Sequence, residues 1–223
     1  MWSNTQVKIA QLAAICMLLI LSVQILKWIS SNEFGIEASG SRERKYGGIE
    51  MSDTKKAVLI IAREIFRDEE LFHTQAALEA AGVQTVVASS KVGICRGKLG
   101  ALAETTVLVD NLKADDFDAI VFIGGIGAKE YYDSPAALNL AKDADAKGKV
   151  VAAICIAPRI LANAGLLESV KATCYESETE ALKKLGADFQ PNDVVRDGKI
   201  VTANGPHAAT NFGKTIAQAL EAD

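Results

Sequence analysis

The sequence predicts an α/β domain built on a mainly parallel sheet with helices on both faces. Predicted strands and helices alternate from residue 55 to the carboxyl end, and the strands are continuous apolar runs, as expected where both sheet faces are covered. The 223 residues suffice for one such domain with an appendage. A net charge of −4 gives no basic footprint for nucleic acid, so nucleic-acid binding is not expected.

The first predicted elements form a strand–helix–strand unit. Residues 57–62, "AVLIIA", are predicted to be a buried strand. Asp68 is expected to cap a helix that runs through "EELFHTQAALEAAG" and ends at Gly82. Residues 83–89, "VQTVVAS", are the second predicted strand.

The second half continues the alternation. A third strand over residues 117–125 ends in a glycine pair, and a helix over 134–148 has a serine cap, a proline in its first turn and a terminal glycine. A fourth strand, "KVVAAI", leads into the next helix. The last predicted elements are a short helix over 180–187, a hairpin over 194–203 closed by Asp197-Gly198, and a helix from Pro206 to about Ala219.

The amino-terminal end departs from this globular pattern. Residues 9–26 contain no charged residue across 18 positions, and with Trp28 and Ile29 the run approaches the roughly 20 residues that cross a bilayer. A transmembrane anchor is therefore expected within residues 1–29, in contact with lipid over residues 9–29. A cleaved signal peptide and a buried soluble helix are the alternatives.

Residues 30–54 are rich in serine, glycine and charge and are expected to form a flexible linker to a domain over residues 55–223. The predicted localisation is a single-pass membrane protein. Because a short tail before a first anchor often stays cytoplasmic, the domain is placed outside the cytosol.

Cys155 lies between the fourth strand and the helix that follows it. Ala153 and Ala157 flank it at the spacing of the small residues in a G-x-S-x-G nucleophile elbow, and Pro158 suits the first turn of the helix. Helix-start N–H groups aimed at the sulfur would lower the thiol pKa. The alternative is a cysteine that simply packs in the core.

The glycine pair after the third strand provides a second candidate feature. The N–H of Gly125, together with that of Ile156, would form a two-donor oxyanion hole, although a plain strand-ending turn would have the same sequence. No metal or other cofactor is expected. The two histidines, His73 and His207, are not in ligand spacing with any cysteine.

Three stretches, "AICIAPRILANAGLL", the glycine pair and "FRDEELF", together resemble the ThiJ/PfpI family of the class I glutamine amidotransferase-like superfamily. The resemblance runs from about Lys55 to Leu220. Relatives include intracellular cysteine peptidases and the parkinsonism-associated deglycase. It implies a flavodoxin-like three-layer sandwich, a nucleophilic cysteine on the elbow, and a homodimer or higher oligomer. It also implies action on small reactive carbonyls, glycated adducts or peptide bonds.

Carried over by position, the resemblance makes Cys155 the nucleophile and Gly125 and Ile156 the oxyanion donors. Peptidase-type members have a histidine directly after the cysteine, and Ile156 in its place counts against a peptidase. Twenty positions after the cysteine, where some members have histidine and others tyrosine, this chain has Tyr175.

Most members also place a glutamate after the first strand, and alignment on "DEEL" puts Arg67 there. An arginine would favour the thiolate or bind a substrate carboxylate, but it cannot transfer protons. The candidates for proton transfer are Glu64, Glu70, Tyr175 and His207. The predicted substrate-binding residues are Arg67, Gly124, Tyr131 and His207.

The predicted function is that of a cysteine-dependent hydrolase or lyase. Its substrate would be a small reactive carbonyl, a glycated adduct or an amide. One alternative is a thiol-based redox or stress sensor, or a protective binding protein without turnover, because an accessible activated thiol oxidises readily. A cysteine peptidase or amidase acting on peptides is the second alternative.

Overall fold

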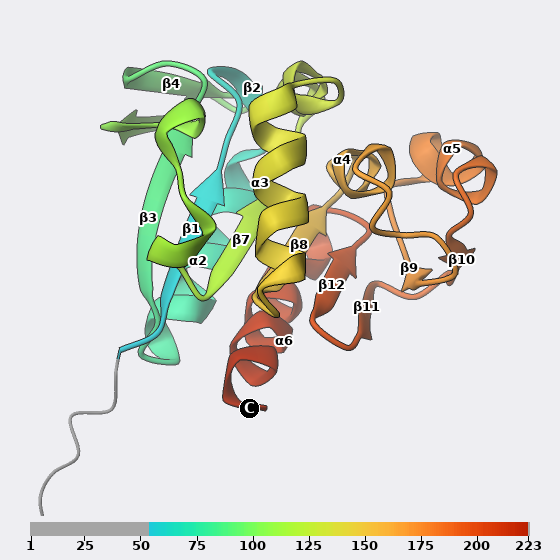
Figure 1. Ribbon diagram of the computed structural model, residues 1–223. Coiled ribbons are helices and arrows are strands. Elements are labelled where there is room, and N and C mark those ends of the chain that lie inside the picture. Colours follow the sequence, from blue (N-terminus) through green and yellow to red (C-terminus); the bar gives the residue numbers. More distant parts are fainter. Residues whose placement is uncertain (1–53, 223) are drawn as a thin grey trace, which may run out of the picture. The chain divides into compact units, whose positions relative to one another are not determined.

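The computed structural model describes residues 54–222. Its centre is a seven-stranded sheet of order β11-β12-β8-β7-β1-β3-β6, in which only the β11–β12 pair is antiparallel (Figure 1). The strands are β1 (Lys56–Ile60), β3 (Gln84–Ser89), β6 (Val107–Leu108), β7 (Ala119–Phe122), β8 (Val150–Ile154), β11 (Val194–Asp197) and β12 (Ile200–Ala203). This arrangement confirms the flavodoxin-like α/β fold with a mostly parallel sheet.

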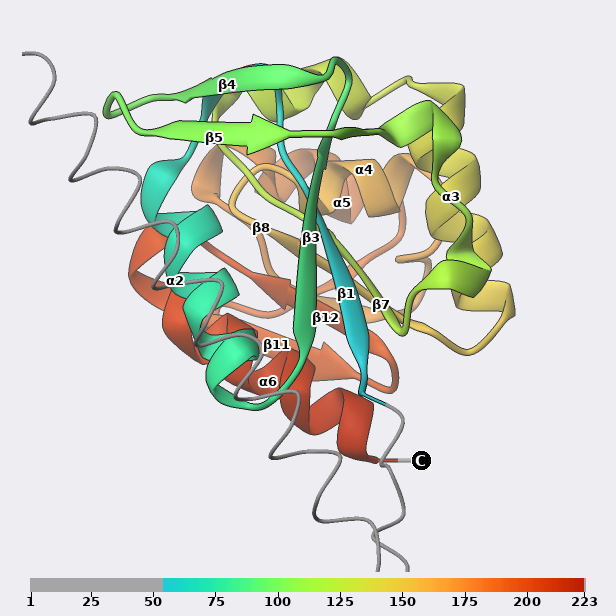
Figure 2. The same ribbon diagram turned by 90° about the vertical axis from the view of Figure 1, so that its left-hand side faces the viewer.

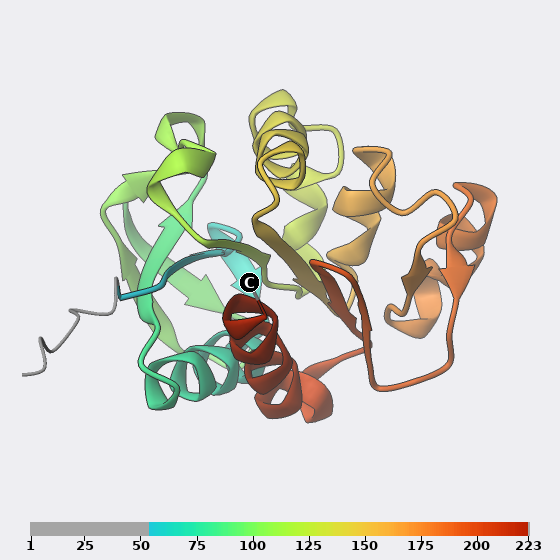
Figure 3. The ribbon, with the colours of Figure 1, turned by 60° about the horizontal axis from the view of Figure 1, so that its bottom comes forward.

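Helices cover both faces of the sheet. Helices α2 (Asp68–Ala80) and α6 (Ala209–Glu221) lie together on one face, and α3 (Pro135–Ala146) and α4 (Pro158–Asn163) lie on the other (Figure 3). The α2–α6 crossing is close: a Cβ on Gly213 would lie 2.7 Å from the Cβ of Ala77. The remaining helices are α5 (Thr179–Lys184) and the 3₁₀ turns η1 (Val109–Asn111), η2 (Ala114–Asp116), η3 (Ile126–Tyr131), η4 (Glu176–Glu178) and η5 (Pro206–Ala208).

The core lies on the central strands. Every residue of β7 and β8 is buried, as the continuous apolar runs predicted. Ser134 caps α3 by accepting a hydrogen bond from the Ala137 N–H, and Gly198 closes the β11–β12 hairpin with φ of 58°. The predicted cap, proline start and hairpin are therefore confirmed.

Two small sheets were not predicted. A three-stranded sheet of order β2-β4-β5 lies beside the amino-terminal end of α2 (Figure 2), and a two-stranded sheet pairs β9 with β10. Their strands are short and none of them is a run of buried residues, so no continuous apolar run marks them. The strands are β2 (Glu64–Phe66), β4 (Gly93–Gly97), β5 (Leu102–Thr105), β9 (Lys171–Ala172) and β10 (Asp188–Phe189).

Asp68 does not cap α2 as expected. It is the first residue of the helix, and the residue before it, Arg67, makes no side-chain cap. The Asp68 carboxylate instead accepts hydrogen bonds of 2.8 Å from the N–H groups of Leu99 and Ala101. It thereby fastens the turn between β4 and β5 to the first turn of α2.

The predicted membrane anchor is corrected. No helix in residues 54–222 combines the length and the apolar character needed to cross a bilayer. The anchor segment (1–29) and all of the linker except Thr54 fall outside the described residues. The transmembrane helix, its bilayer contact and the membrane localisation are therefore not supported.

Candidate active site

Cys155 lies on a sharp turn between β8 and α4. Its φ is 63°, a left-handed conformation that is unfavourable for a residue with a side chain and is often found at functional sites. Its N–H donates to the Ala203 carbonyl at 2.8 Å, and its carbonyl accepts from the Tyr175 N–H at 2.7 Å. Two neighbouring segments thus hold the turn, and the side chain is left facing a cavity while the residue is only 8% exposed.

Glu70 is the acid beside this thiol. Its side chain comes from the first turn of α2 and is completely buried. One carboxylate oxygen, Oε2, accepts a hydrogen bond from the Gly124 N–H at 3.0 Å, and the carboxyl group lies beside the Cys155 thiol. The other oxygen, Oε1, is buried and has no hydrogen-bond partner within residues 54–222. The position that alignment gave to Arg67 therefore belongs to Glu70.

The sequence did contain a signal for Glu70. It lies on the same helical face as three buried residues, Thr74, Ala77 and Leu78, at spacings of one and two helical turns. A carboxylate in that stripe points at the core, where an acid needs a partner. Alignment on "DEEL" placed the glutamate position three residues, nearly one helical turn, too early.

Burial dominates the protonation of the pair. It raises the pKa of Glu70 to about 7, and this effect outweighs the hydrogen bonds from Cys155 and Gly124 and the nearby charge of Arg67. Burial, followed by the charge of Glu70, raises the pKa of Cys155 to about 12, although the N–H groups of Gly125 and Ile156 donate toward the sulfur. The predicted lowering of the thiol pKa is therefore wrong, and the thiol needs a base.

A cavity of about 270 Å³ opens onto this pair. Its apolar wall includes Ile126, Ile156 and Pro206, while Arg67 and Lys98 supply basic side chains. Lys98 was not foreseen, because it lies in the turn between two strands that the sequence did not reveal. The cavity can therefore hold a small polar molecule next to the sulfur, with apolar surface on one side.

Arg67 lines the cavity but is engaged by its own helix. Its guanidinium binds the Glu69 carboxylate through two hydrogen bonds, of 2.8 and 3.1 Å. Its backbone N–H donates to the Gly124 carbonyl at 3.0 Å. Arg67 thus joins the start of α2 to the glycine loop, and it tunes Glu70 through its charge.

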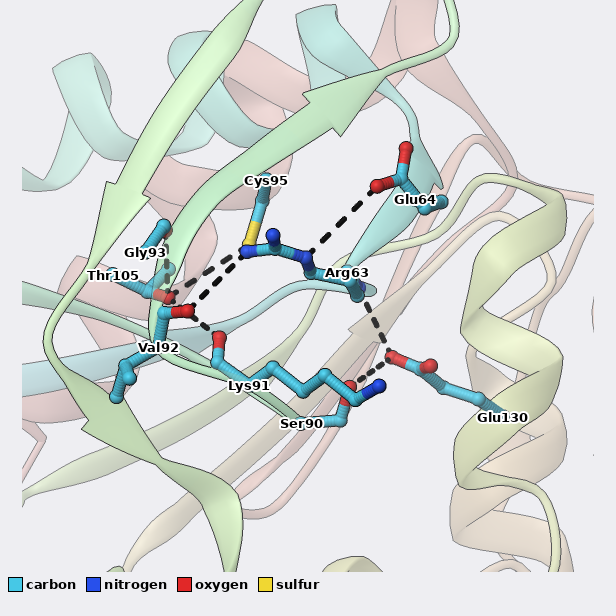
Figure 4. A network of polar contacts seen from close by, with 9 residues as sticks. All are labelled: Arg63, Glu64, Ser90, Lys91, Val92, Gly93, Cys95, Thr105 and Glu130. Carbon is cyan, nitrogen blue, oxygen red and sulfur yellow. Dashed lines mark hydrogen bonds and ion pairs between the residues drawn. The ribbon is translucent and has the colours of Figure 1, made fainter.

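Glu64 is not part of the cavity lining. Its side chain is half exposed and pairs with Arg63 at 3.9 Å, within a polar network that includes the exposed Glu130 and extends to the buried Thr105 (Figure 4). The role of proton-transfer acid suggested for Glu64 therefore has no geometric support, since Glu70 holds the place beside the sulfur.

The glycine loop and its tyrosines also differ from expectation. The N–H of Gly124 is bound to Glu70 and its carbonyl to Arg67, so neither group is free for a substrate. Tyr131 is buried, and its hydroxyl donates to the Ile61 carbonyl at 2.8 Å, away from the cavity. The Tyr132 hydroxyl instead donates to the Ile156 carbonyl at 3.2 Å, next to Cys155.

Tyr175 and His207 occupy different parts of the site. Tyr175 is 49% exposed and lines the Cys155 cavity. His207 lies outside this cavity, and its Nε2 is 3.1 Å from the Asp193 carboxylate. Within residues 54–222 no cluster of three or more His, Cys, Asp or Glu side chains could hold a metal ion.

Comparison with known proteins agrees with this fold. An uncharacterized protein of Methanocaldococcus jannaschii is 41% identical over 169 residues, covering 74% of this chain and 82% of that protein. Deglycase PfpI of Pyrococcus furiosus is 30% identical over 149 residues, covering 67% and 90%. The crystal structure of a ThiJ/PfpI domain protein from Brachyspira murdochii aligns with a TM-score of 0.74 at 34% identity, covering 76% and 98%. With the DJ-1/PfpI family profile matching residues 55–219, the chain belongs to the DJ-1/PfpI family.

Proposed function

We propose that this protein is a cysteine-dependent hydrolase of the deglycase type, acting on small dicarbonyls and on their adducts with amines. The contact between the Cys155 thiol and the buried Glu70 carboxyl carries the proposal. A nucleophile with a raised pKa requires an adjacent base, and Glu70, with a pKa of about 7, exchanges protons readily near neutral pH. The deglycase name of the Pyrococcus furiosus relative supports the choice of substrate.

The first step on an amine adduct of methylglyoxal is a substitution at the carbinol carbon. The Glu70 carboxylate takes the thiol proton and the sulfur bonds to the carbon. The carbon–nitrogen bond breaks, and the amine leaves with the proton from Glu70. With free methylglyoxal the sulfur adds to the aldehyde instead, and the N–H groups of Gly125 and Ile156 stabilise the oxyanion until Glu70 protonates it.

Both routes give the same hemithioacetal. Glu70 removes the proton from the sulfur-bearing carbon, and reprotonation at the neighbouring carbon yields a lactoyl thioester. Water then cleaves the carbon–sulfur bond, which releases lactate and restores the thiol. The oxidation of one carbon is balanced by the reduction of the next, so no external oxidant or cofactor takes part.

The alternatives fit the site less well. A peptidase would need a second acid–base group beside the thiol, and Ile156 stands where peptidase-type relatives have histidine. A redox sensor requires a thiol that is largely ionised in the resting protein, whereas burial raises the pKa of Cys155. The site is better arranged for a thiol that is deprotonated when its substrate arrives.

The test is turnover of methylglyoxal and of fluorogenic peptides by the full chain and by Cys155→Ser and Glu70→Gln. Both variants should lose at least about 100-fold in kcat/KM for methylglyoxal, since each removes a group required for nucleophilic or acid–base chemistry. Cys95→Ser and Glu79→Gln, matched changes away from the cavity, should keep it. Turnover that survives in Cys155→Ser would reject the proposal, and cleavage of peptides alone would indicate the peptidase.

A further inference from the structure

A second cavity adjoins the one at Cys155. It has a volume of about 410 Å³ and lies between the segment that follows β9 and the loop that follows β12. Tyr175 and Pro206 line both cavities, so the two share a wall. Phe189 and Pro191 give the second cavity an apolar side, and Glu176 and His207 supply a carboxylate and an imidazole.

We infer that this second cavity is a subsite for the amine portion of a glycated amino acid or peptide, with lysine as the preferred amine. The inference rests on the proposed function and specifies its substrate class. It makes Tyr175, Pro206 and Gly205 residues that determine specificity, in addition to the groups that perform the chemistry.

Volume supports a substrate that spans both cavities. Pockets for small ligands usually measure roughly 300–1,000 Å³, and the Cys155 cavity, at about 270 Å³, falls below that range. A three-carbon dicarbonyl is small enough for this cavity, whereas an attached amino acid would use the neighbouring space. Together with the neighbouring cavity, the space reaches the usual range.

Reaction geometry supports the same assignment. The carbon attacked by sulfur is the carbon that carries nitrogen in an adduct, so the amine must extend out of the Cys155 cavity. Tyr175 and Pro206 border the space into which it would extend. The half-exposed Tyr175 ring offers an apolar surface to the methylene groups of a lysine side chain.

The first cavity is lined by basic side chains and the second contains a carboxylate, which is the distribution of charge that a lysine adduct requires. Arg67 and Lys98 supply basic side chains to the first cavity, where carbonyl oxygens would lie. The second contains the Glu176 carboxylate, which has no ion-pair partner among residues 54–222. His207 at its edge is already paired with Asp193. The protonated lysine amine that is released when the carbon–nitrogen bond breaks is therefore attracted to the second cavity rather than to the first.

Gly205 allows the second cavity to be filled selectively. Its φ of 164° is extended backbone that any residue adopts. A Cβ there would be 3.8 Å from the Tyr175 ring, an ordinary contact. Gly205 lines the second cavity and not the Cys155 cavity. Gly205→Leu would therefore occupy the subsite without displacing the sulfur or Glu70.

The experiment compares two substrates in the full-length protein: free methylglyoxal and its adduct with Nα-acetyl-lysine amide. For the adduct, Gly205→Leu should lower kcat/KM at least about tenfold, while methylglyoxal turnover should stay within about twofold. Glu176→Gln should raise KM for the adduct by about two- to fivefold, and this increase should be smaller at high salt. Glu180→Gln makes the same change of charge outside both cavities and should leave KM unchanged. Equal effects on both substrates, or none on either, would overturn the subsite.

A binding measurement separates this inference from the proposed function. Nα-acetyl-lysine amide, the released amine, should shift the backbone amide resonances of Thr173, Tyr175, Glu176 and Gly205 in the wild type, and these shifts should be lost in Gly205→Leu. If the wild type turns over neither substrate but these shifts occur, the proposed function fails and the subsite stands. If the shifts are absent, the subsite is refuted whatever the turnover.

Discussion

The backbone N–H of Gly124 donates a hydrogen bond of 3.0 Å to the carboxylate of Glu70. This bond fixes one oxygen of a completely buried acid whose carboxyl group also contacts the Cys155 thiol. A Cβ on Gly124 would lie 2.5 Å from Glu70 Oε2 and 2.6 Å from the Cβ of Cys155. Acid and thiol can meet here because the residue between them has no side chain.

Gly124→Ala should therefore inactivate the enzyme and destabilise the fold. The added methyl group must push Glu70 and Cys155 apart, and overpacking of this kind costs about 1–3 kcal/mol. Methylglyoxal turnover and the free energy of unfolding by urea would be measured together. Gly198→Ala is the matched control, because a Cβ there meets open space in a hairpin far from the cavity. It should lose some stability through its φ of 58° and keep its activity. A fully active Gly124→Ala would contradict the proposed geometry.

Glu70→Gln should stabilise the protein at alkaline pH. The pKa of Glu70 is about 7 in the folded state against 4.5 as its ordinary value, so the folded protein binds more protons between those values. Stability then falls as pH rises through this window, and above it the full cost of a buried charge remains. Glutamine carries no such charge and keeps the acceptor for Gly124. At pH 8 the gain should be on the order of 1–3 kcal/mol, and below pH 4 it should vanish. A constant difference at all pH values would contradict this prediction.

The rate should follow the protonation of Glu70. Because the carboxylate accepts the thiol proton, kcat/KM for methylglyoxal should rise as pH increases through about 7. The positive charge of Arg67 lowers the pKa of Glu70, so Arg67→Ala should move the rise to higher pH. A pH–rate profile checks both. Arg196→Ala, whose side chain donates to the Gly198 carbonyl and lines neither cavity, should leave the profile unchanged.

Tyr132 should act as a positioning residue. Its hydroxyl donates to the Ile156 carbonyl, and burial raises the pKa of this phenol, so it remains a donor throughout the working range. Tyr132→Phe removes the hydrogen bond to the Ile156 carbonyl, so the backbone next to the Ile156 N–H is held less firmly. We expect kcat to fall about three- to tenfold with little change in KM. Tyr131→Phe, which removes a hydroxyl bound to the Ile61 carbonyl, should reduce stability but not kcat. Equal kcat losses in both variants would indicate a merely structural effect.

The homodimer or higher oligomer implied by the family resemblance stays a prediction. The β4–β5 hairpin exposes Ile94, Leu99 and Leu102, at 41, 62 and 56%. Grouped apolar side chains of this kind are typical of interaction surfaces. Leu102→Lys should lower the mass measured by light scattering, whereas Leu185→Lys, the same substitution at an exposed leucine just after α5, should not. A monomeric wild type would reject the oligomer.

The parts of this structure that sequence could predict are those set by burial of continuous runs. Strands β7 and β8 are apolar at every position because helices cover both sheet faces. Since reactive groups lie beyond the carboxyl ends of such strands, this pattern also predicted where Cys155 and the glycine loop lie. The short strands β2, β4 and β5 gave no such run, so Lys98 was missed. To place Glu70 beside the sulfur, the helical register of α2 must be known, and to predict the thiol pKa, the degree of burial must be known. A linear motif contains neither.

The first turn of α2 makes two separate contacts within three residues. Asp68 holds the β4–β5 turn through the N–H groups of Leu99 and Ala101, while Glu70, two positions later, faces Cys155. A Cβ on Gly97 would collide with the Asp68 carboxylate, so even a methyl group in the hairpin would press on this turn. A genetic screen for inactive variants should therefore recover substitutions at Asp68 and Gly97. Neither residue lines the cavity, yet substitutions at either one should inactivate the enzyme as active-site substitutions do.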